Sequence, residues 1–145
     1  MRWWFLVERD IKIELRNISK LEYQIFEEFE ELEYLNSLKT SIKSFDYSSD
    51  KVKSSPKNHD FADIIIKISD LEREVCKNLN VLIAKRQKAC DMFESLPTEL
   101  CDIMKLKYLY NYSFEEISKR LSYSLRHVYR LHGQALQILR KEPGC

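Results

Sequence analysis

The residues best suited to chemistry lie on the outer face of one predicted helix, residues 124–140, near the end of the chain. Segment 113–141 holds six Lys and Arg against two Asp and Glu. Arginine can donate hydrogen bonds to guanine, and an apolar side chain can contact a thymine methyl group. We therefore predict that this helix reads base edges in the major groove of double-stranded DNA through Leu125, Arg126, His127, Tyr129 and Arg130.

A second group of polar residues surrounds this helix and is suited to contacts with the DNA backbone. Cationic, hydroxyl, imidazole and amide side chains are common donors to phosphate oxygens and fix the register of a protein on the duplex. The predicted backbone-contacting residues are Lys119, Arg120, Ser124, His132 and Gln134.

Two short helices must position these side chains. The run Ser113 to Glu116 fits a capping box that starts the first helix, and Ser124 caps the second. The turn between them is predicted at residues 121–123, with a small residue, Ser118, where the helices cross. The predicted shared core is apolar: Ile117, Leu121, Val128 and Leu131. This is the pattern of a helix-turn-helix.

A further helix is predicted from Thr98 to Tyr110, after Pro97 ends the long helix before it. Its expected inward residues are Leu100, Ile103, Leu106 and Leu109.

Residues 96–141 resemble region 4 of sigma-70-type RNA polymerase sigma factors. The resemblance is carried by Leu96-Pro97, Phe114-Glu115-Glu116-Ile117, Leu121-Ser122-Tyr123-Ser124, Ala135-Leu136 and Leu139-Arg140. It implies DNA binding, with the recognition-helix positions falling on the base-reading residues predicted above. The chain departs from the family at Ser122, where a Gly is usual, at Ser118, where an Ala is usual, and at Arg126, where an acidic residue is usual.

Over residues 10–140 the layout also resembles small proteins of Firmicutes phages and prophages, similar to RinA/ArpU-type regulators of late transcription. This resemblance rests on the long helices and on segments such as Ile68 to Glu74 and Leu131 to Leu136. It implies transcriptional control, with RNA polymerase as a further candidate partner.

The first 95 residues predict two long helices. Between Arg9 and Ser44 there is no Gly or Pro, and apolar residues recur every three or four positions. A second stripe runs from Phe61 to Phe93, interrupted by Arg86, with Asp60 as the expected N-cap. The polar segment 45–59 is the expected loop. The fold class is therefore all-α: a long antiparallel, coiled-coil-like hairpin followed by a helix-turn-helix.

We expect residues 1–95 to form a dimerisation hairpin and residues 96–145 the DNA-binding domain. Two long helices have a thin core, so a homodimer would bury more apolar surface. The alternative is a monomeric hairpin folded back on the C-terminal helices. The hairpin also carries an acidic face of six glutamates, either a solvated face or a docking surface for a basic partner: Glu22, Glu27, Glu28, Glu30, Glu31 and Glu33.

Other functional classes find little support. The sequence has no Gly-rich phosphate loop, no His-Glu-x-x-His motif and no paired Cys and His spacing, so we expect neither an enzyme nor a metal or other cofactor. The apolar run Trp3 to Val7 is too short for a membrane span, and unpaired cysteines suit a cytoplasmic protein. The remaining alternative is an assembly protein: a phage packaging factor like a terminase small subunit, or a sigma-interacting adaptor.

Overall fold

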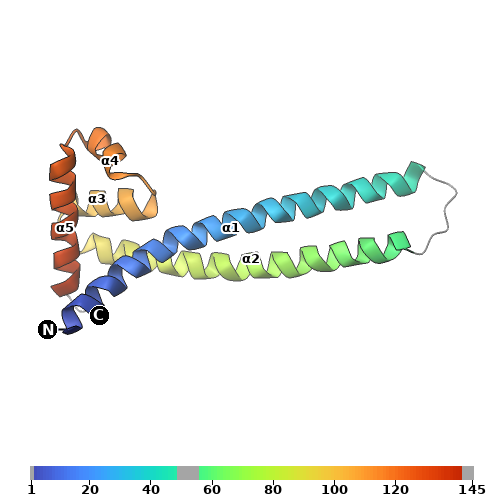
Figure 1. The fold of residues 1–145 in the computed structure, drawn as a ribbon, viewed down its shortest axis with the longest axis horizontal. Coiled ribbons are helices and arrows are strands. Elements are labelled where there is room, and N and C mark those ends of the chain that lie inside the picture. Colours follow the sequence, from blue (N-terminus) through green and yellow to red (C-terminus); the bar gives the residue numbers. More distant parts are fainter. Residues whose placement is uncertain (1, 49–55, 142–145) are drawn as a thin grey trace. The chain divides into compact units, whose positions relative to one another are not determined.

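The computed structural model describes the backbone of residues 2–48 and 56–141, and the side chains of residues 11–44 and 60–141. Five α-helices and one short π-helix, η1, account for almost all of this backbone, which contains no strand (Figure 1). The predicted all-α class is confirmed. The elements follow in the order α1 (Arg2–Ser48), α2 (Pro56–Glu94), α3 (Thr98–Met104), η1 (Lys105–Leu109), α4 (Phe114–Leu121) and α5 (Leu125–Lys141).

Both long helices extend further than the sequence pattern predicts. Helix α1 continues to Ser48, and α2 begins at Pro56, so both ends of the predicted loop are helical, and residues 49–55 of that loop lie outside the described backbone. Proline suits the first turn of a helix, because the amide hydrogen that it lacks would have no partner there. Asp60 therefore lies inside α2, and its predicted N-cap role is wrong.

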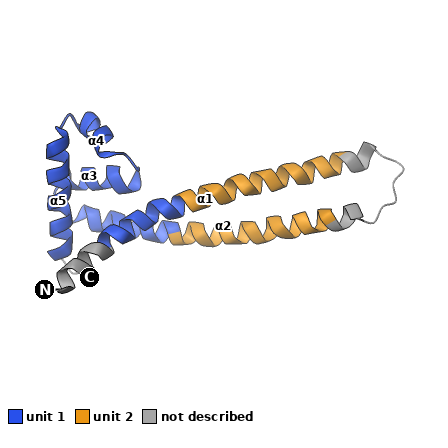
Figure 2. Ribbon diagram, in the orientation of Figure 1, with its two compact units in different colours: residues 1–22, 82–145 blue, residues 23–81 orange. Residues whose placement is uncertain are grey.

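The chain divides into two compact units (Figure 2). Unit 1 combines Met1–Glu22 with Leu82–Cys145, and unit 2 is Tyr23–Val81. Each long helix therefore contributes to both units. The predicted DNA-binding segment, residues 96–145, falls entirely within unit 1.

Unit 2 is a pair of antiparallel helix segments with a thin core. Its buried residues are aliphatic and come from the predicted stripes of α1 and α2: Ile25, Leu35, Ile68 and Val75. The Asn78 amide donates to both carboxylate oxygens of Glu28, at 2.9 and 3.1 Å, and so joins the two helices. A core of this size leaves large apolar side chains outside it.

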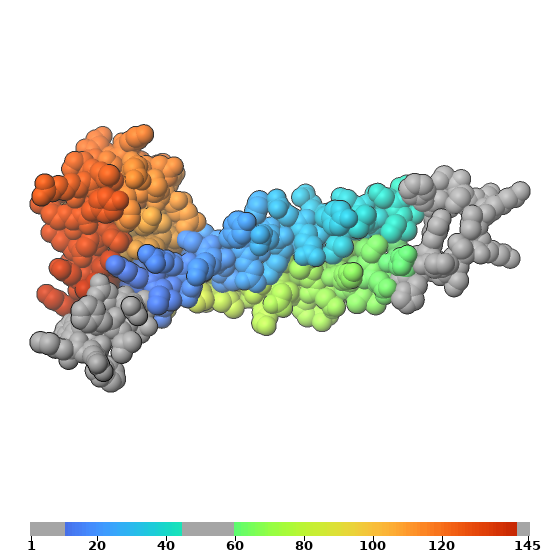
Figure 3. Space-filling model, viewed as in Figure 1, coloured from blue at the N-terminus to red at the C-terminus, as the bar shows by residue number. Residues whose placement is uncertain are grey.

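Unit 1 holds the main hydrophobic core. Helices α3, α4 and α5 pack with residues 11–18 of α1 and with the end of α2 (Figures 1 and 3). Its most deeply buried side chains come from all five α-helices: Leu15, Phe93, Ile103, Met104, Ile117 and Val128. This core packs the helix-turn-helix against residues 11–18 of α1 and residues 82–93 of α2.

The predicted helix 98–110 is α-helical only to Met104. Residues Lys105–Leu109 form η1, whose wider turn adds a residue to the hydrogen-bonded ring. The inward face therefore shifts: Met104 and Tyr108 are buried, whereas Leu106, predicted to point inward, is only half-buried. Regular α-helical spacing could not have revealed this change.

Candidate nucleic-acid interface

The first helix of the helix-turn-helix, α4, starts at a complete capping box. The Ser113 amide donates to the Glu116 carboxylate at 2.8 Å, and the Glu116 amide donates to the Ser113 hydroxyl at 3.2 Å. Two backbone donors at the helix start are thus satisfied, as the sequence predicts. Such a cap contributes about 1 kcal/mol of stability.

The turn after α4 is tightened by two serines. Ser122 has a positive φ of 57°, the conformation in which the family's usual Gly carries no side-chain penalty. The Ser118 hydroxyl donates to the Tyr123 carbonyl at 2.6 Å, and the Tyr123 amide donates to the Ser118 carbonyl at 3.0 Å. Ser118 therefore lies at the close approach where a small residue is predicted, and its hydroxyl also holds the turn.

Helix α5 is positioned by its cap and by its buried face. The Ser124 hydroxyl accepts a hydrogen bond from the His127 amide at 3.2 Å. The buried residues face α3 and α4, and they are Val128, Leu131, Ala135, Leu136 and Leu139. The apolar spacing of this helix predicts Val128, Leu131, Ala135, Ile138 and Leu139 inward. Leu136 is buried in addition, and Ile138 is only partly buried. The opposite face of α5 is left to solvent.

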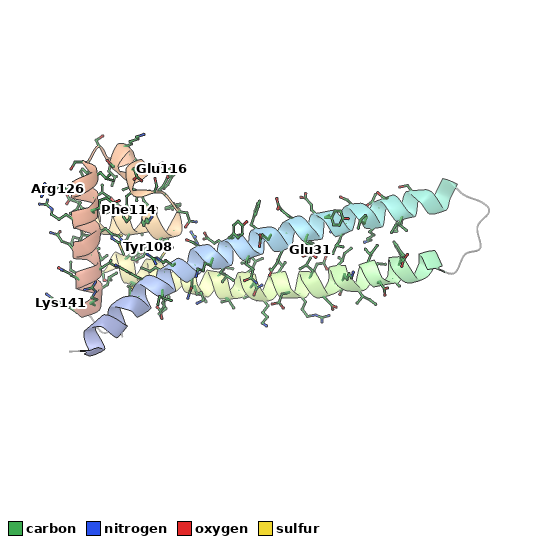
Figure 4. All side chains as sticks on the ribbon, in the orientation of Figure 1. Glu31, Tyr108, Phe114, Glu116, Arg126 and Lys141 are labelled. Atoms are coloured by element: carbon green, nitrogen blue, oxygen red, sulfur yellow. The ribbon has the colours of Figure 1, made fainter. Side chains whose placement is uncertain are left out.

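The solvent-facing surface of α5 contains four of the five predicted base-reading residues. Leu125 is 37% and Tyr129 49% exposed, and Arg126 and Arg130 are exposed as well. Arg126 projects away from the body of unit 1 (Figure 4). The apolar side chain of Leu125 and the planar guanidinium groups of Arg126 and Arg130 thus lie within six residues of one helix. Such groups are suited to contacts with base edges.

The fifth residue, His127, is half-buried and orients its neighbour. Its Nδ1 lies 2.9 Å from Arg130 Nη2. Because arginine only donates, Nδ1 is the acceptor of this hydrogen bond. The ring edge also packs on Tyr123, with centroids 4.9 Å apart. His127 therefore restrains the guanidinium of Arg130.

Four of the five predicted backbone-contacting residues are exposed to solvent. Three of them, Lys119, Ser124 and Gln134, lie on α4, on the turn and on α5. Arg120 is exposed too, but its Nη1 donates to the Tyr112 hydroxyl at 3.1 Å and its guanidinium lies 5.2 Å from the Tyr112 ring centroid. This holds Arg120 along the surface of α4.

His132 points inward. The Tyr108 hydroxyl and His132 Nε2 share a hydrogen bond of 2.8 Å, and the two rings stack with centroids 5.8 Å apart. Burial, reinforced by the charges of Lys12 and Lys107, lowers the pKa of His132 to about 4. A neutral ring held in this way suits core packing, and its predicted contact with phosphate has no support in this geometry.

One cation near the interface was not predicted. Lys107 in η1 places its ammonium 4.3 Å from the Phe114 ring centroid, and Phe114 packs on Tyr129 at 4.7 Å between centroids. This cation–π contact orients the aromatic residue that supports Tyr129. The π-helical register of η1 has no signal in the spacing of apolar residues, so sequence reasoning missed it.

The described residues contain no group of three or more His, Cys, Asp or Glu side chains that could hold a metal ion. Cys76, Cys90 and Cys101 are free thiols. Within the same part of the chain, no helix has the length and apolar character needed to cross a bilayer.

Residues 92–141 match the family model described as Sigma-70, region 4. The match covers the end of α2 and all of α3, η1, α4 and α5. No curated protein and no solved structure matches the chain. The C-terminal part of the chain is thus a sigma-70 region 4-like helix-turn-helix, a DNA-binding fold and not an enzymatic one, and this part of the predicted architecture is confirmed.

Proposed function

We propose that this protein is a sequence-specific transcriptional regulator that inserts α5 into the DNA major groove. The observation that carries the proposal is the outer face of α5. On a helix-turn-helix of the sigma-70 region 4 type, this face presents Leu125, Arg126, Tyr129 and Arg130 to solvent. Cations are costly to bury, and two exposed arginines beside a large apolar residue complement a groove lined by acceptors and thymine methyl groups.

Each side chain has a role that its chemistry suggests. Arg126 and Arg130 donate to guanine N7 and O6, and Leu125 contacts a thymine methyl group. His127 acts by holding Arg130. Because Arg126 stands where related domains have an acidic residue, the preferred sequence differs from an ordinary −35 promoter element.

The DNA backbone would be held by Lys119, Arg120, Ser124 and Gln134, which all lie on the exposed surface of α4, the turn or α5. His132 is left out of this set because its ring bonds with Tyr108. Neutralised phosphates contribute most of the salt-dependent affinity and little of the sequence preference.

The long helices supply the second half of the proposal. Residues 1–95 would join two copies and set the spacing of two half-sites, and residues 96–145 would bind them. Apolar surface on α2 is left for a second copy to cover: Ile65, Ile66, Val81 and Ile83 are exposed. The same proposal includes contact with RNA polymerase and the phage origin that the whole-chain resemblance implies. The family match covers residues 92–141 and does not extend to these two points.

The test is selection of bound sequences from a random duplex library, with the wild-type protein and with Arg126→Ala. We expect an enriched motif that loses information at one or two positions in the variant. A symmetric motif would support the dimer. If a folded, helical protein enriches no sequence, the proposal fails, and the packaging or sigma-adaptor alternative becomes the better one.

A further inference from the structure

One flank of α1 in unit 2 exposes four aromatic side chains within twelve residues. Tyr23, Phe26, Phe29 and Tyr34 are between 47% and 64% exposed. Isolated exposed apolar residues are ordinary, but grouped ones mark interaction sites. Aromatic residues are also the type most enriched at the centre of protein interfaces.

These residues do not belong to the core between α1 and α2. The core of unit 2 takes Ile25 and Leu35 from α1. A helix with 3.6 residues per turn places Phe26, Glu30 and Glu33 on a different side from Ile25. It places Tyr23 and Tyr34 still farther from Ile25 around the helix axis. A shallow groove runs along this side and is lined only by α1 residues: Phe26, Phe29, Glu30, Leu32, Glu33 and Asn36.

The same flank is strongly acidic. Glu30 and Glu33 are exposed between the aromatic rings, and no Lys or Arg occurs in α1 between Leu21 and Leu38. A hydrogen bond to Glu27, together with the charges of Glu27 and Glu30, raises the pKa of the Tyr23 phenol. We call the set Tyr23, Phe26, Phe29, Glu30, Glu33 and Tyr34 the aromatic–acidic face.

A second copy is a poor occupant for this face. A two-fold interface brings the same patch from both subunits together. Glu30 and Glu33 lie near the middle of the face, so pairing it with itself would set carboxylates against carboxylates. Like charges in contact at an interface cost several kcal/mol. The face therefore complements a partner of opposite charge.

We propose that the aromatic–acidic face docks a basic amphipathic helix of another protein. The partner helix presents apolar side chains at three- and four-residue spacing to Phe26 and Phe29, and flanking Lys or Arg side chains to Glu30 and Glu33. This inference goes beyond DNA binding, because unit 2 holds the face and unit 1 holds the proposed DNA surface. The protein would then recruit a second protein to its DNA site.

The first experiment uses the full-length chain and a displayed library of 20-residue helical peptides, randomised on the apolar stripe and at the flanking positions. Binders to wild type are collected after removal of those that also bind Phe26→Ala/Phe29→Ala. We expect enriched peptides with large apolar residues on the stripe and Lys or Arg beside it. Enrichment of neutral or acidic peptides, or of none, would overturn the proposal.

Charge reversal supplies the second experiment. One selected peptide is synthesised, and its dissociation constant is measured with wild type and with Glu30→Lys/Glu33→Lys. We expect affinity to fall by about tenfold or more, the scale of a central interface residue, and to recover when the peptide's basic residues are replaced by Glu. Glu72→Lys/Glu74→Lys makes the same charge change on exposed positions of α2 and should leave binding within about twofold. Equal loss in both variants would count against the assigned face.

Two further measurements keep this inference separate from the proposed function. Sedimentation velocity of Phe26→Ala/Phe29→Ala should match wild type, and a loss of dimer would assign the face to self-association instead. DNA selection with the same variant should yield the wild-type motif. Peptide binding without any DNA motif would leave this inference standing and sink only the proposed DNA function.

Discussion

The Arg86 guanidinium on α2 pairs with the Glu22 carboxylate on α1. The same Nη1 donates to the Leu109 carbonyl at 3.0 Å, at the end of η1. The other oxygen of Glu22 accepts from the Asn111 amide at 2.7 Å, and Asn111 has a positive φ of 59°. One ion pair thus joins both long helices to the segment that enters the helix-turn-helix.

Arg86→Ala should lower the free energy of unfolding by about 1–3 kcal/mol, because it leaves the Leu109 carbonyl and the Glu22 carboxylate without a partly buried donor. Urea unfolding followed by circular dichroism measures the change. A cycle with Glu22→Gln should return a coupling energy of about 0.5 kcal/mol or more, since the two residues touch. Arg73→Ala is the control: its pair with Asp70 is exposed at 3.8 Å and should contribute within about 0.5 kcal/mol. Equal effects of the two arginine variants would contradict the role given to Arg86.

Ser122→Gly should stabilise the fold by about 0.5–1 kcal/mol. Its φ of 57° is a left-handed conformation that penalises any side chain, and part of the gain is offset by the freedom of glycine in the unfolded chain. Ser122→Val should have the opposite effect, because a β-branched residue is an outlier at positive φ. Thermal melting ranks the stabilities of wild type and the two variants. If Ser122→Gly were less stable than wild type, the backbone strain assigned to Ser122 would be wrong.

His132 should make stability fall with pH below about 6.5. Its pKa is lowered to about 4 in the fold, mainly by burial, against about 6.5 for an unfolded histidine. Between these values the unfolded chain binds a proton that the folded chain refuses, so stability present above pH 6.5 is lost as the pH falls towards 4. The melting temperatures of wild type and His132→Phe are compared at pH 7 and pH 4.5. We expect wild type to lose more than the variant does, and an equal loss in both proteins would contradict the burial of a neutral His132.

Arg126→Ala and Arg130→Ala should each cost about 1–3 kcal/mol on the selected sequence and relax preference at separate base positions. Competition between the selected duplex and single-base variants measures both the affinity and the base preference of each protein. Arg120→Ala, whose guanidinium lies along Tyr112, should weaken all duplexes alike. Unchanged preference in both Arg126→Ala and Arg130→Ala would mean that α5 is not the reading helix.

Lys119→Ala should weaken binding to every duplex and flatten its dependence on salt. One lost phosphate contact reduces the slope of log affinity against log salt by about 0.9. Titrations at four salt concentrations give this slope. Lys67→Ala removes the same charge from an exposed position in unit 2, and a slope change of equal size there would show that Lys119 acts only through net charge.

Local rules were enough to predict much of the helix-turn-helix. Ser113 with Glu116 signalled the start of α4, and Ser124 signalled the start of α5, because capping depends on residues three positions apart. The inward positions of Ile117, Val128 and Leu131 followed from the same short-range periodicity. The outward positions of Leu125, Arg126, Tyr129 and Arg130 followed from those.

The sequence shows that Arg86 interrupts the apolar stripe of α2, but it does not show why. The partners of Arg86, Glu22 and Leu109, lie 64 and 23 residues away in the chain, and no local pattern encodes contacts of that separation.

The sequence by itself determined the all-α class, the two long helices and the likeness of residues 96–141 to sigma-70 region 4, since these depend on periodicity, caps and short motifs. The tertiary structure decided which polar residues face inward. His132 looked outward by type, but the π-helical turn of η1 brings the Tyr108 hydroxyl within 2.8 Å of its ring. Each residue turns a helix by about 100°, so the wider turn of η1 shifts the side chains that follow it relative to a regular α-helix.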